Sequence, residues 1–229
     1  MDLPIAHNFI EDKYTLGVVN IVDANVKEIP VGIAPYDVVL ASDSKAYVSN
    51  WGGRKPRIGE STYNTSGSQV LVDPTTGIAN NGTVSVIDLI TNVQVKSIDV
   101  GLHPGGMVLS PDGARLFVAC ANSDIISVIN TDTDEVIEEI SVHMEKDLLF
   151  GSSPNALTIS QDGKSLYVAN GTDNAICVIQ LGMPGQIVGY IPTGWYPGAV
   201  ILDEKTNCLI VANIKGVGSR NQKNKQSWI

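Results

Sequence analysis

The sequence contains few of the residues and motifs that carry metal, redox or nucleotide chemistry. Of its 229 residues, only three are histidine and three are cysteine. No Gly-x-Ser-x-Gly, His-Glu-x-x-His or Gly-x-x-x-x-Gly-Lys-Ser/Thr motif occurs. These motifs mark a nucleophile elbow, a zinc-peptidase helix and a phosphate-binding loop, respectively. We therefore expect no catalytic residues, no metal ligands and no cofactor in this chain, and we predict that the segment is not an enzyme.

The three cysteines exclude two further classes of protein. Cys120, Cys177 and Cys208 are odd in number and far apart, which is incompatible with a metal knuckle or a disulfide framework. Each lies inside a strand-like apolar run of a different part of the chain. We therefore expect all three to be small, buried apolar residues.

Basic residues and long apolar runs are also scarce. The chain has 15 Lys and Arg against 24 Asp and Glu, and its net charge of −9 disfavours nucleic acid as a partner. No run of about 18 apolar residues is present, so we expect no membrane span. The first residues, Met1 to Pro4, show no signal-peptide pattern. Positive charge collects at 215–229, which contains four basic residues and no acidic one.

What the chain does contain is one pattern that occurs four times. Each copy opens with Gly-x-x-Pro, continues through an apolar stretch and a turn, and closes on Tyr-Val-Ala-Asn or a variant of it. The opening prolines are Pro35, Pro104, Pro154 and Pro197. A repeat of about 40 to 50 residues that consists of short strands and turns is typical of a β-propeller.

The second copy shows how one blade is built. Alternating apolar residues predict strands at 106–109, 116–119, 126–129 and 136–140. Between the first two strands, the sequence Ser110-Pro111-Asp112-Gly113 predicts a tight turn, because Pro presets φ and Gly accepts a positive φ. We call the four strands a to d, from first to last in the chain.

We predict an all-β fold, a β-propeller of four-stranded antiparallel blades that forms a partial ring with three full blades and two half blades. The whole chain, 1–229, would be one propeller segment. Its predicted parts are a half blade at 17–31, full blades at 35–100, 104–142 and 154–192, a half blade at 197–213, and a loop insertion at 51–81. In the first half blade, we place strand c at 17–23.

Strand alternation also predicts which loops share a side of the array. The a-to-b and c-to-d turns should lie on one side, and the b-to-c loops and d-to-a crossings on the other. Almost every irregular segment falls on the second side, so we expect the binding surface there. Both sheet faces should be apolar, with inter-blade packing by these residues: Met107, Leu109, Phe117, Val118, Val128, Ile129, Leu157, Ile159, Tyr167, Val168, Val178 and Ile179.

A partial ring has a consequence for assembly. Apolar faces would remain uncovered at its two ends, and such faces favour self-association. The alternative is a closed ring, in which strands near 17–31 complete the blade that begins at 197–213.

These repeats resemble the YVTN family of β-propellers, which includes surface-layer-type proteins and is commonly seven-bladed. The resemblance covers 17–213 and is carried by the recurring turn, the Tyr-Val-x-Asn unit and the Val-x-Val-Ile-Asp unit, as at Val84–Asp88. It implies a periplasmic or cell-surface location.

More narrowly, the chain is similar to the propeller region of bacterial proteins that join such a propeller to a phosphoesterase domain of the alkaline phosphatase superfamily. The likeness is carried by five segments: Tyr47–Gly53, Val72–Ala79, Gly151–Ala156, Pro192–Ala199 and Val211–Gly216. It implies that a catalytic domain would normally accompany the propeller.

The candidate ligand-binding residues lie on the irregular loops. Cations and aromatic rings above a propeller channel can hold an anionic or sugar-like ligand. The candidates are Trp51, Arg54, Arg57, His103, Trp195, Tyr196, Lys215 and Arg220. In the alternative interpretation, the two tryptophans pack the loops down and the cations are simply solvated.

Two other polar patterns have structural interpretations. Asn130-x-Asp132-x-Asp134 resembles the opening of a calcium loop, but Asx turns explain it better. The asparagines that end strand b, Asn50, Asn170 and Asn213, are interpreted as acceptors that shape the following loop.

We therefore predict a non-catalytic recognition or scaffold module that binds through its irregular loop face. The expected partner at the channel mouth is an anionic small molecule, a glycan or a protein. One alternative is the substrate-guiding propeller of a phosphoesterase whose catalytic domain is not in this chain. A second alternative is a propeller lactonase-type enzyme, which would need acids and a histidine or metal at the channel mouth.

Overall fold

A computed structural model describes residues 15–19, 26–65, 67–145, 151–216, 220–221 and 226–227. All regular structure in these residues is β-strand. None of the described segments is a helix that could cross a membrane.

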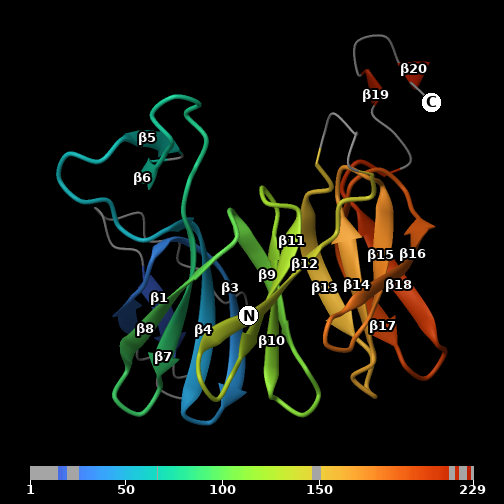
Figure 1. Ribbon diagram of the computed structural model, residues 1–229, viewed down its shortest axis with the longest axis horizontal. Helices are drawn as coiled ribbons and strands as arrows, with labels where there is room; N and C mark the ends of the chain where they lie inside the picture. Colours follow the sequence, from blue (N-terminus) through green and yellow to red (C-terminus); the bar gives the residue numbers. More distant parts are fainter. Residues whose placement is uncertain are drawn as a thin grey trace, which may run out of the picture.

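Three four-stranded antiparallel sheets form the full blades (Figure 1). The first consists of β3 (Ile33–Ser42), β4 (Lys45–Gly53), β7 (Gly82–Asp88) and β8 (Val93–Val100). The second consists of β9 (Pro104–Leu109), β10 (Arg115–Cys120), β11 (Ile125–Asn130) and β12 (Glu135–Ser141). The third consists of β13 (Pro154–Ile159), β14 (Ser165–Asn170), β15 (Ala175–Gln180) and β16 (Gln186–Pro192).

Two-stranded sheets complete the array. One half blade is β1 (Thr15–Val19) with β2 (Val26–Pro30), and the other is β17 (Pro197–Asp203) with β18 (Cys208–Asn213). Two hairpins lie outside the blades: β5 (Thr62–Thr65) with β6 (Ser68–Leu71), and β19 (Arg220–Asn221) with β20 (Gln226–Ser227). The prediction of three full and two half blades is confirmed.

The blades stand side by side, with their first strands β3, β9, β13 and β17 as successive neighbours. The half blade β1–β2 contacts β8, and β17–β18 lies at the other end of the array (Figure 1). Among the described strands, β18 pairs with β17 and β1 pairs with β2, and neither has a second partner. The array is thus an open arc, and the alternative of a ring closed within one chain is not what the structure shows.

The first half blade corrects one predicted boundary. We expected strand c at 17–23, but β1 begins at Thr15, opposite Pro30, and residues 20–23 of the prediction lie outside the described part of the chain. The segment Thr15–Val19 therefore matches Thr83–Ile87, whose first residue lies opposite Asp99 near the end of strand d. The repeat unit begins two residues earlier than its apolar pattern indicated.

The hydrophobic core lies between the blades. Tyr47 and Val86 of the first blade pack with Leu116 and Val118 of the second in one buried cluster. Phe117 and its neighbours in the second blade form another cluster with residues of the third, such as Leu166, Val168 and Ile179. The twelve residues predicted for inter-blade packing are all buried or half-buried, so that prediction is confirmed.

Close packing requires the glycine of each Gly-x-x-Pro opening, and at three of the four openings the end of the repeat's own strand b makes the close approach. A Cβ at Gly32 would lie 2.6 Å from the Gly53 carbonyl oxygen and 2.7 Å from the Asn50 side chain. A Cβ at Gly101 would lie 2.6 Å from the Cβ of Cys120. The first, second and fourth openings thus fit against their own second strand only without a side chain, whereas a Cβ at Gly151 would meet the Asp124 side chain of the preceding blade.

This close packing supports a stability prediction. We expect Gly32→Ala to lower the free energy of unfolding by about 1–3 kcal/mol, because the added methyl group meets backbone that cannot move away cheaply. Urea denaturation measures the effect. Gly189→Ala in β16 is the matched control, since its Cβ would meet nothing within 4 Å. Equal effects of the two substitutions would contradict the argument.

The asparagines at the ends of strand b do not act as predicted. The Asn50 amide nitrogen donates to Ser85 Oγ at 2.9 Å, and that of Asn170 donates to the Val142 carbonyl at 3.0 Å. Their Oδ1 atoms, and that of Asn213, are buried without a partner among the described residues. The interpretation of these residues as acceptors was wrong, because these oxygens accept no hydrogen bond in the described part of the chain, although the Asn170 amide does donate to Asp173 in the following loop.

One cysteine also departs from expectation. Cys120 and Cys177 are fully buried between blades, as predicted, but Cys208 is exposed. It lies on β18, on the face that no blade covers. The prediction for Cys208 was wrong because burial at its position requires a following blade.

The calcium-like segment is a turn that links two blades. Asn130 Oδ1 accepts hydrogen bonds from the backbone of Asp132 and Thr133, at 2.9 and 3.0 Å, as in an Asx turn. The Asp134 carboxylate accepts a hydrogen bond from the Tyr47 hydroxyl and pairs with Lys45 Nζ at 2.6 Å. These oxygens hold the first blade against the second.

Candidate functional site

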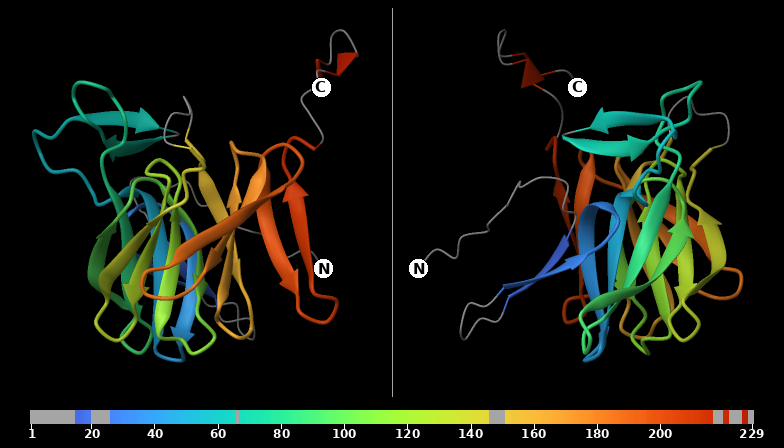
Figure 2. Two further views of the ribbon diagram at one scale, coloured as in Figure 1. Left: turned by 45° about the vertical axis from the view of Figure 1, so that its right-hand side comes forward. Right: turned by 90° about the vertical axis from the view of Figure 1, so that its left-hand side faces the viewer.

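The irregular segments share one side of the array, as predicted. The b-to-c insertion between β4 and β7 carries the hairpin β5–β6 above this side, while the short a-to-b and c-to-d turns lie at the opposite end of the blades (Figure 2). Because β4 extends to Gly53, the insertion is shorter than the predicted 51–81. We call this side the loop face.

An ion pair closes the base of the insertion. The Arg54 guanidinium binds both oxygens of Glu60, with Nη2 to Oε1 at 2.6 Å and Nη1 to Oε2 at 2.9 Å. Oε2 also accepts the backbone N–H of Arg57 at 2.6 Å. The Arg54 hydrogen bond, followed by the one from the Arg57 backbone, lowers the pKa of Glu60 to about 2. Arg54 is thus neutralised by a carboxylate near pH 7.

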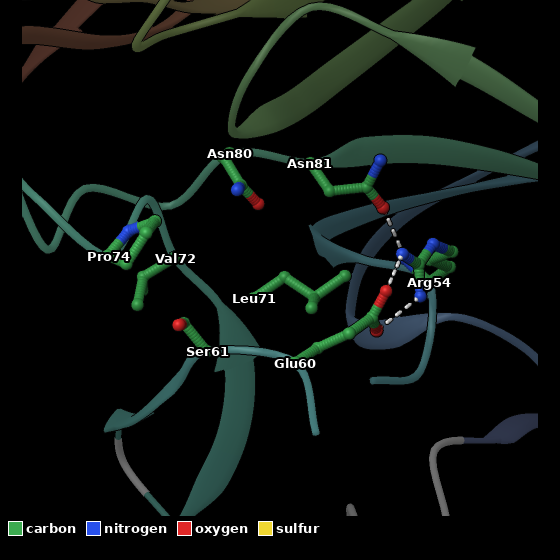
Figure 3. A pocket seen from close by; sticks show the side chains of 8 residues that line it. All are labelled: Arg54, Glu60, Ser61, Leu71, Val72, Pro74, Asn80 and Asn81. Carbon is green, nitrogen blue, oxygen red and sulfur yellow. Dashed lines mark hydrogen bonds and ion pairs between the residues drawn. The ribbon is translucent and has the colours of Figure 1, made fainter. Parts of the chain in front are cut away.

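A cavity of about 310 Å³ lies beside this ion pair. It is lined by Arg54, Glu60, Ser61, Leu71, Val72, Pro74, Asn80 and Asn81 (Figure 3). Its volume is at the small end of the roughly 300–1,000 Å³ that ligand pockets occupy. Asn81 Oδ1 accepts the Arg54 backbone N–H at 2.7 Å and ties the two ends of the insertion together.

The cavity combines an apolar surface with available hydrogen-bonding groups. Leu71, Val72 and Pro74 supply the apolar part. The side chains of Ser61 and Asn80 point into the space from opposite sides (Figure 3). Within the described part of the chain, no hydrogen bond is found for the Ser61 hydroxyl or the Asn80 side-chain amide. One hydroxyl and one amide, each able to donate and accept, are therefore free for a ligand.

Two predicted site residues form a separate aromatic pair. The rings of Trp51 and His103 lie with their centroids 4.9 Å apart and tilted by 35°. Burial lowers the pKa of His103, and its Nδ1 is buried without a partner among the described residues. His103 is thus a neutral ring near pH 7 and supplies no positive charge to the loop face.

A third group lies at the far end of the arc. Lys215 Nζ stands 5.3 Å from the centre of the Tyr196 ring, and the Lys215 backbone N–H donates to the Trp195 carbonyl at 3.1 Å. The Tyr196 hydroxyl lies 3.4 Å from Ser153 Oγ. The structure thus brings the Tyr196 and Lys215 side chains together as a group of their own, to which Trp195 is joined through its backbone.

The two remaining candidates, Arg57 and Arg220, belong to none of these groups. The Arg57 side chain is exposed. Arg220 begins β19, and its side chain lies outside what the structure describes.

Sequence reasoning missed the residues that line the cavity opposite Arg54. Glu60 follows Arg54 by six residues in the same insertion, and an acid so close in a short loop was a usable sign of pairing. Asn80 and Asn81 carried no such sign, because the approach of Asn81 to Gly53 and Arg54, and of Asn80 to Leu71, depends on how the insertion returns to β7.

A second cavity of about 600 Å³ lies on the side of the short turns. It is lined by Ser160, Gln161, Asp162, Ser165, Tyr167, Leu202, Glu204 and Asn207. Several of its polar groups are already engaged: Ser160 Oγ donates to Asp162 at 2.7 Å, and Glu204 accepts the Gln161 backbone N–H at 2.7 Å. The smaller cavity is the better candidate site because it lies on the loop face, where the irregular segments gather.

Comparison with known proteins supports the fold and nothing finer. No protein-family model and no curated protein matches the chain. Among solved structures, it is similar to a putative 6-phosphogluconolactonase from Bacteroides uniformis, with 15% identity and a TM-score of 0.54 over 93% of this chain and 76% of that one. A hydrazine synthase from Kuenenia stuttgartiensis matches with 17% identity and a TM-score of 0.44 over 87% of this chain and 77% of that one. The first likeness agrees with the β-propeller fold.

Proposed function

We propose that this protein is a non-catalytic recognition module, which binds a neutral, polyhydroxylated ligand such as a glycan in the loop-face cavity. The observation that carries the proposal is the Arg54–Glu60 pair. Because this pair removes net charge from the wall of the cavity, an anion gains little there. A sugar can instead exchange hydrogen bonds with Ser61 and Asn80 and lay a C–H face on Leu71 and Val72.

The family resemblance is compatible with this function. Membership of the YVTN surface-layer-type propellers, and with it a periplasmic or cell-surface location, belongs to the proposal. Glycans are abundant at such surfaces, and a rigid propeller with one elaborated loop face suits their recognition.

Calorimetry with neutral and acidic oligosaccharides tests the proposal. We expect a neutral oligosaccharide to bind, and Ser61→Ala and Asn80→Ala each to weaken it about tenfold, the equivalent of about 1.4 kcal/mol for a lost hydrogen-bonding group. Asn122→Ala is the control, because Asn122 is an exposed asparagine in the b-to-c loop of the second blade, away from the cavity.

Two results would contradict this function. Salt-sensitive binding of acidic ligands only, weakened by Arg57→Ala, would favour the anion-binding alternative instead. Hydrolysis of a sugar lactone by the purified chain would favour the lactonase alternative.

A further inference from the structure

The two ends of the arc carry uncovered apolar faces. On the outer face of β17–β18, Ile201 is 59% exposed and Ile210 is 55% exposed, beside the exposed Ala199 and Ala212. On the outer face of β3, at the other end, apolar side chains are exposed as well. They are Val38 at 49% and Leu40 at 65%.

The repeat shows that these two faces are the halves of one interface. Aligned on the opening prolines, Val38 and Leu40 occupy the positions of Met107 and Leu109 in the second blade. Met107 and Leu109 pack against Tyr47 of the preceding blade.

The same alignment assigns the opposite face. Ile210 occupies the strand-b position of Tyr47 and Phe117, which both pack against the blade that follows them. The β17–β18 face therefore corresponds to the face on which the first strand of the next blade packs. The β3 face corresponds to the face of a first strand that packs on the preceding blade.

The strand edges at the two ends are complementary too. The half blade β17–β18 supplies strands a and b, and β1–β2 supplies strands c and d. In the first blade, Asn50 lies opposite Thr83 and Lys45 opposite Asp88. The same register applied to the half blades would set Asn213 opposite Thr15 and Ala212 opposite Leu16.

Within one chain these edges do not meet. The half blades lie at opposite ends of the arc (Figure 1), and no pairing joins the described strands of one to the other. The apolar face and the strand edge at one end nevertheless match those at the other end. A second copy of this chain can therefore cover both ends.

We propose that two copies join end to end, β18 of each pairing with β1 of the other. Each copy contributes three complete blades, and each of the two junctions completes one composite blade. The ring then has eight blades, within the roughly four to eight that close a propeller. A head-to-tail contact that closes after two copies gives a two-fold ring in which the edges of β18 and β1 are both paired.

Size-exclusion chromatography with light scattering tests the assembly. We expect twice the chain mass of 24.3 kDa for the unmodified protein. Ile210→Asp should shift it to one chain mass and raise the dissociation constant at least about a hundredfold, since it sets a charge in the apolar junction. Ile90→Asp is the control and should leave the mass doubled, because Ile90 is 76% exposed in a turn away from both faces.

Three results of that experiment would overturn the proposal. They are a single chain mass for the unmodified protein, a broad distribution beyond two copies, or an unchanged mass for Ile210→Asp.

Disulfide trapping tests the register and the identity of the occupant. In a Cys208→Ser background, chains with Ala212→Cys are mixed with chains that carry Leu16→Cys. Opposite residues of antiparallel strands have Cα atoms about 4.5–5.5 Å apart, which a disulfide can span. We expect a covalent dimer in this mixture and none when Ile90→Cys replaces Leu16→Cys.

The double variant in one chain completes the test. Two copies joined as proposed give covalent dimers. A disulfide within a single chain would show that the chain closes on itself and would overturn the proposal, as would the absence of any cross-link.

Discussion

Phe117→Ala is expected to lower the free energy of unfolding by about 3–5 kcal/mol, the largest effect of any single substitution considered for this protein. Phe117 is fully buried between the second and third blades, where it packs with Val128, Leu166 and Val168. Its removal leaves a cavity that two sheets, each fixed by its own strand pairing, cannot collapse to fill. Urea denaturation followed by circular dichroism measures the change.

A matched control separates the loss of buried packing from the mere removal of an apolar side chain. Ile90→Ala removes apolar surface from an exposed turn and should change the free energy of unfolding by less than about 0.5 kcal/mol. A similarly small effect of Phe117→Ala would mean that the blades are held together chiefly by something other than this interface.

The second large effect expected is a loss of stability in alkali. Burial raises the pKa of the Cys120 thiol to about 11 and that of Cys177 to about 12. Burial also raises the pKa of Tyr47, with the Asp134 hydrogen bond as the next cause. These groups are neutral when protonated, and a raised pKa in the folded state means that folding favours the protonated form.

The direction with pH follows from that preference. The stabilisation is complete below the unfolded thiol value of about 9 and is lost as the pH rises through the folded values. At pH 11, each buried thiol should cost about 2 kcal/mol relative to pH 8. Urea titrations at the two pH values measure the loss, and Cys120→Ala should make it smaller by about 2 kcal/mol. An unchanged pH dependence in Cys120→Ala would contradict the assignment to that thiol.

The sequence predicted an anionic small molecule among the possible ligands, whereas the structure favours a neutral one. The reason is the pairing and burial of charged groups, which a count of basic residues cannot reveal. Arg54 and His103 were both predicted to supply positive charge to the loop face. The structure neutralises Arg54 with Glu60 and keeps His103 uncharged by burial. Lys215 lies with Tyr196 and Trp195, in a separate group.

The blades could be predicted from the chain because their determinants are local. Alternation of apolar residues specifies each strand, and Pro-Asp-Gly at 111–113 specifies a turn, whatever surrounds them. Burial of both sheet faces followed directly, since a blade is covered on two sides. The two-residue error in the start of β1 arose because the apolar pattern does not mark where this strand begins, whereas the pairing of Thr15 with Pro30 does.

The candidate site and the state of the two ends depend on contacts between distant residues. The cavity exists because Asn81 returns to Arg54 across the insertion, and no local pattern encodes that closure. Cys208 and Cys177 occupy similar apolar strands, yet one is exposed and the other buried, since only the second has a blade on each side. The alternation of side chains in the sequence shows on which face of the sheet a residue lies. Whether the residue is buried depends on whether another sheet covers that face.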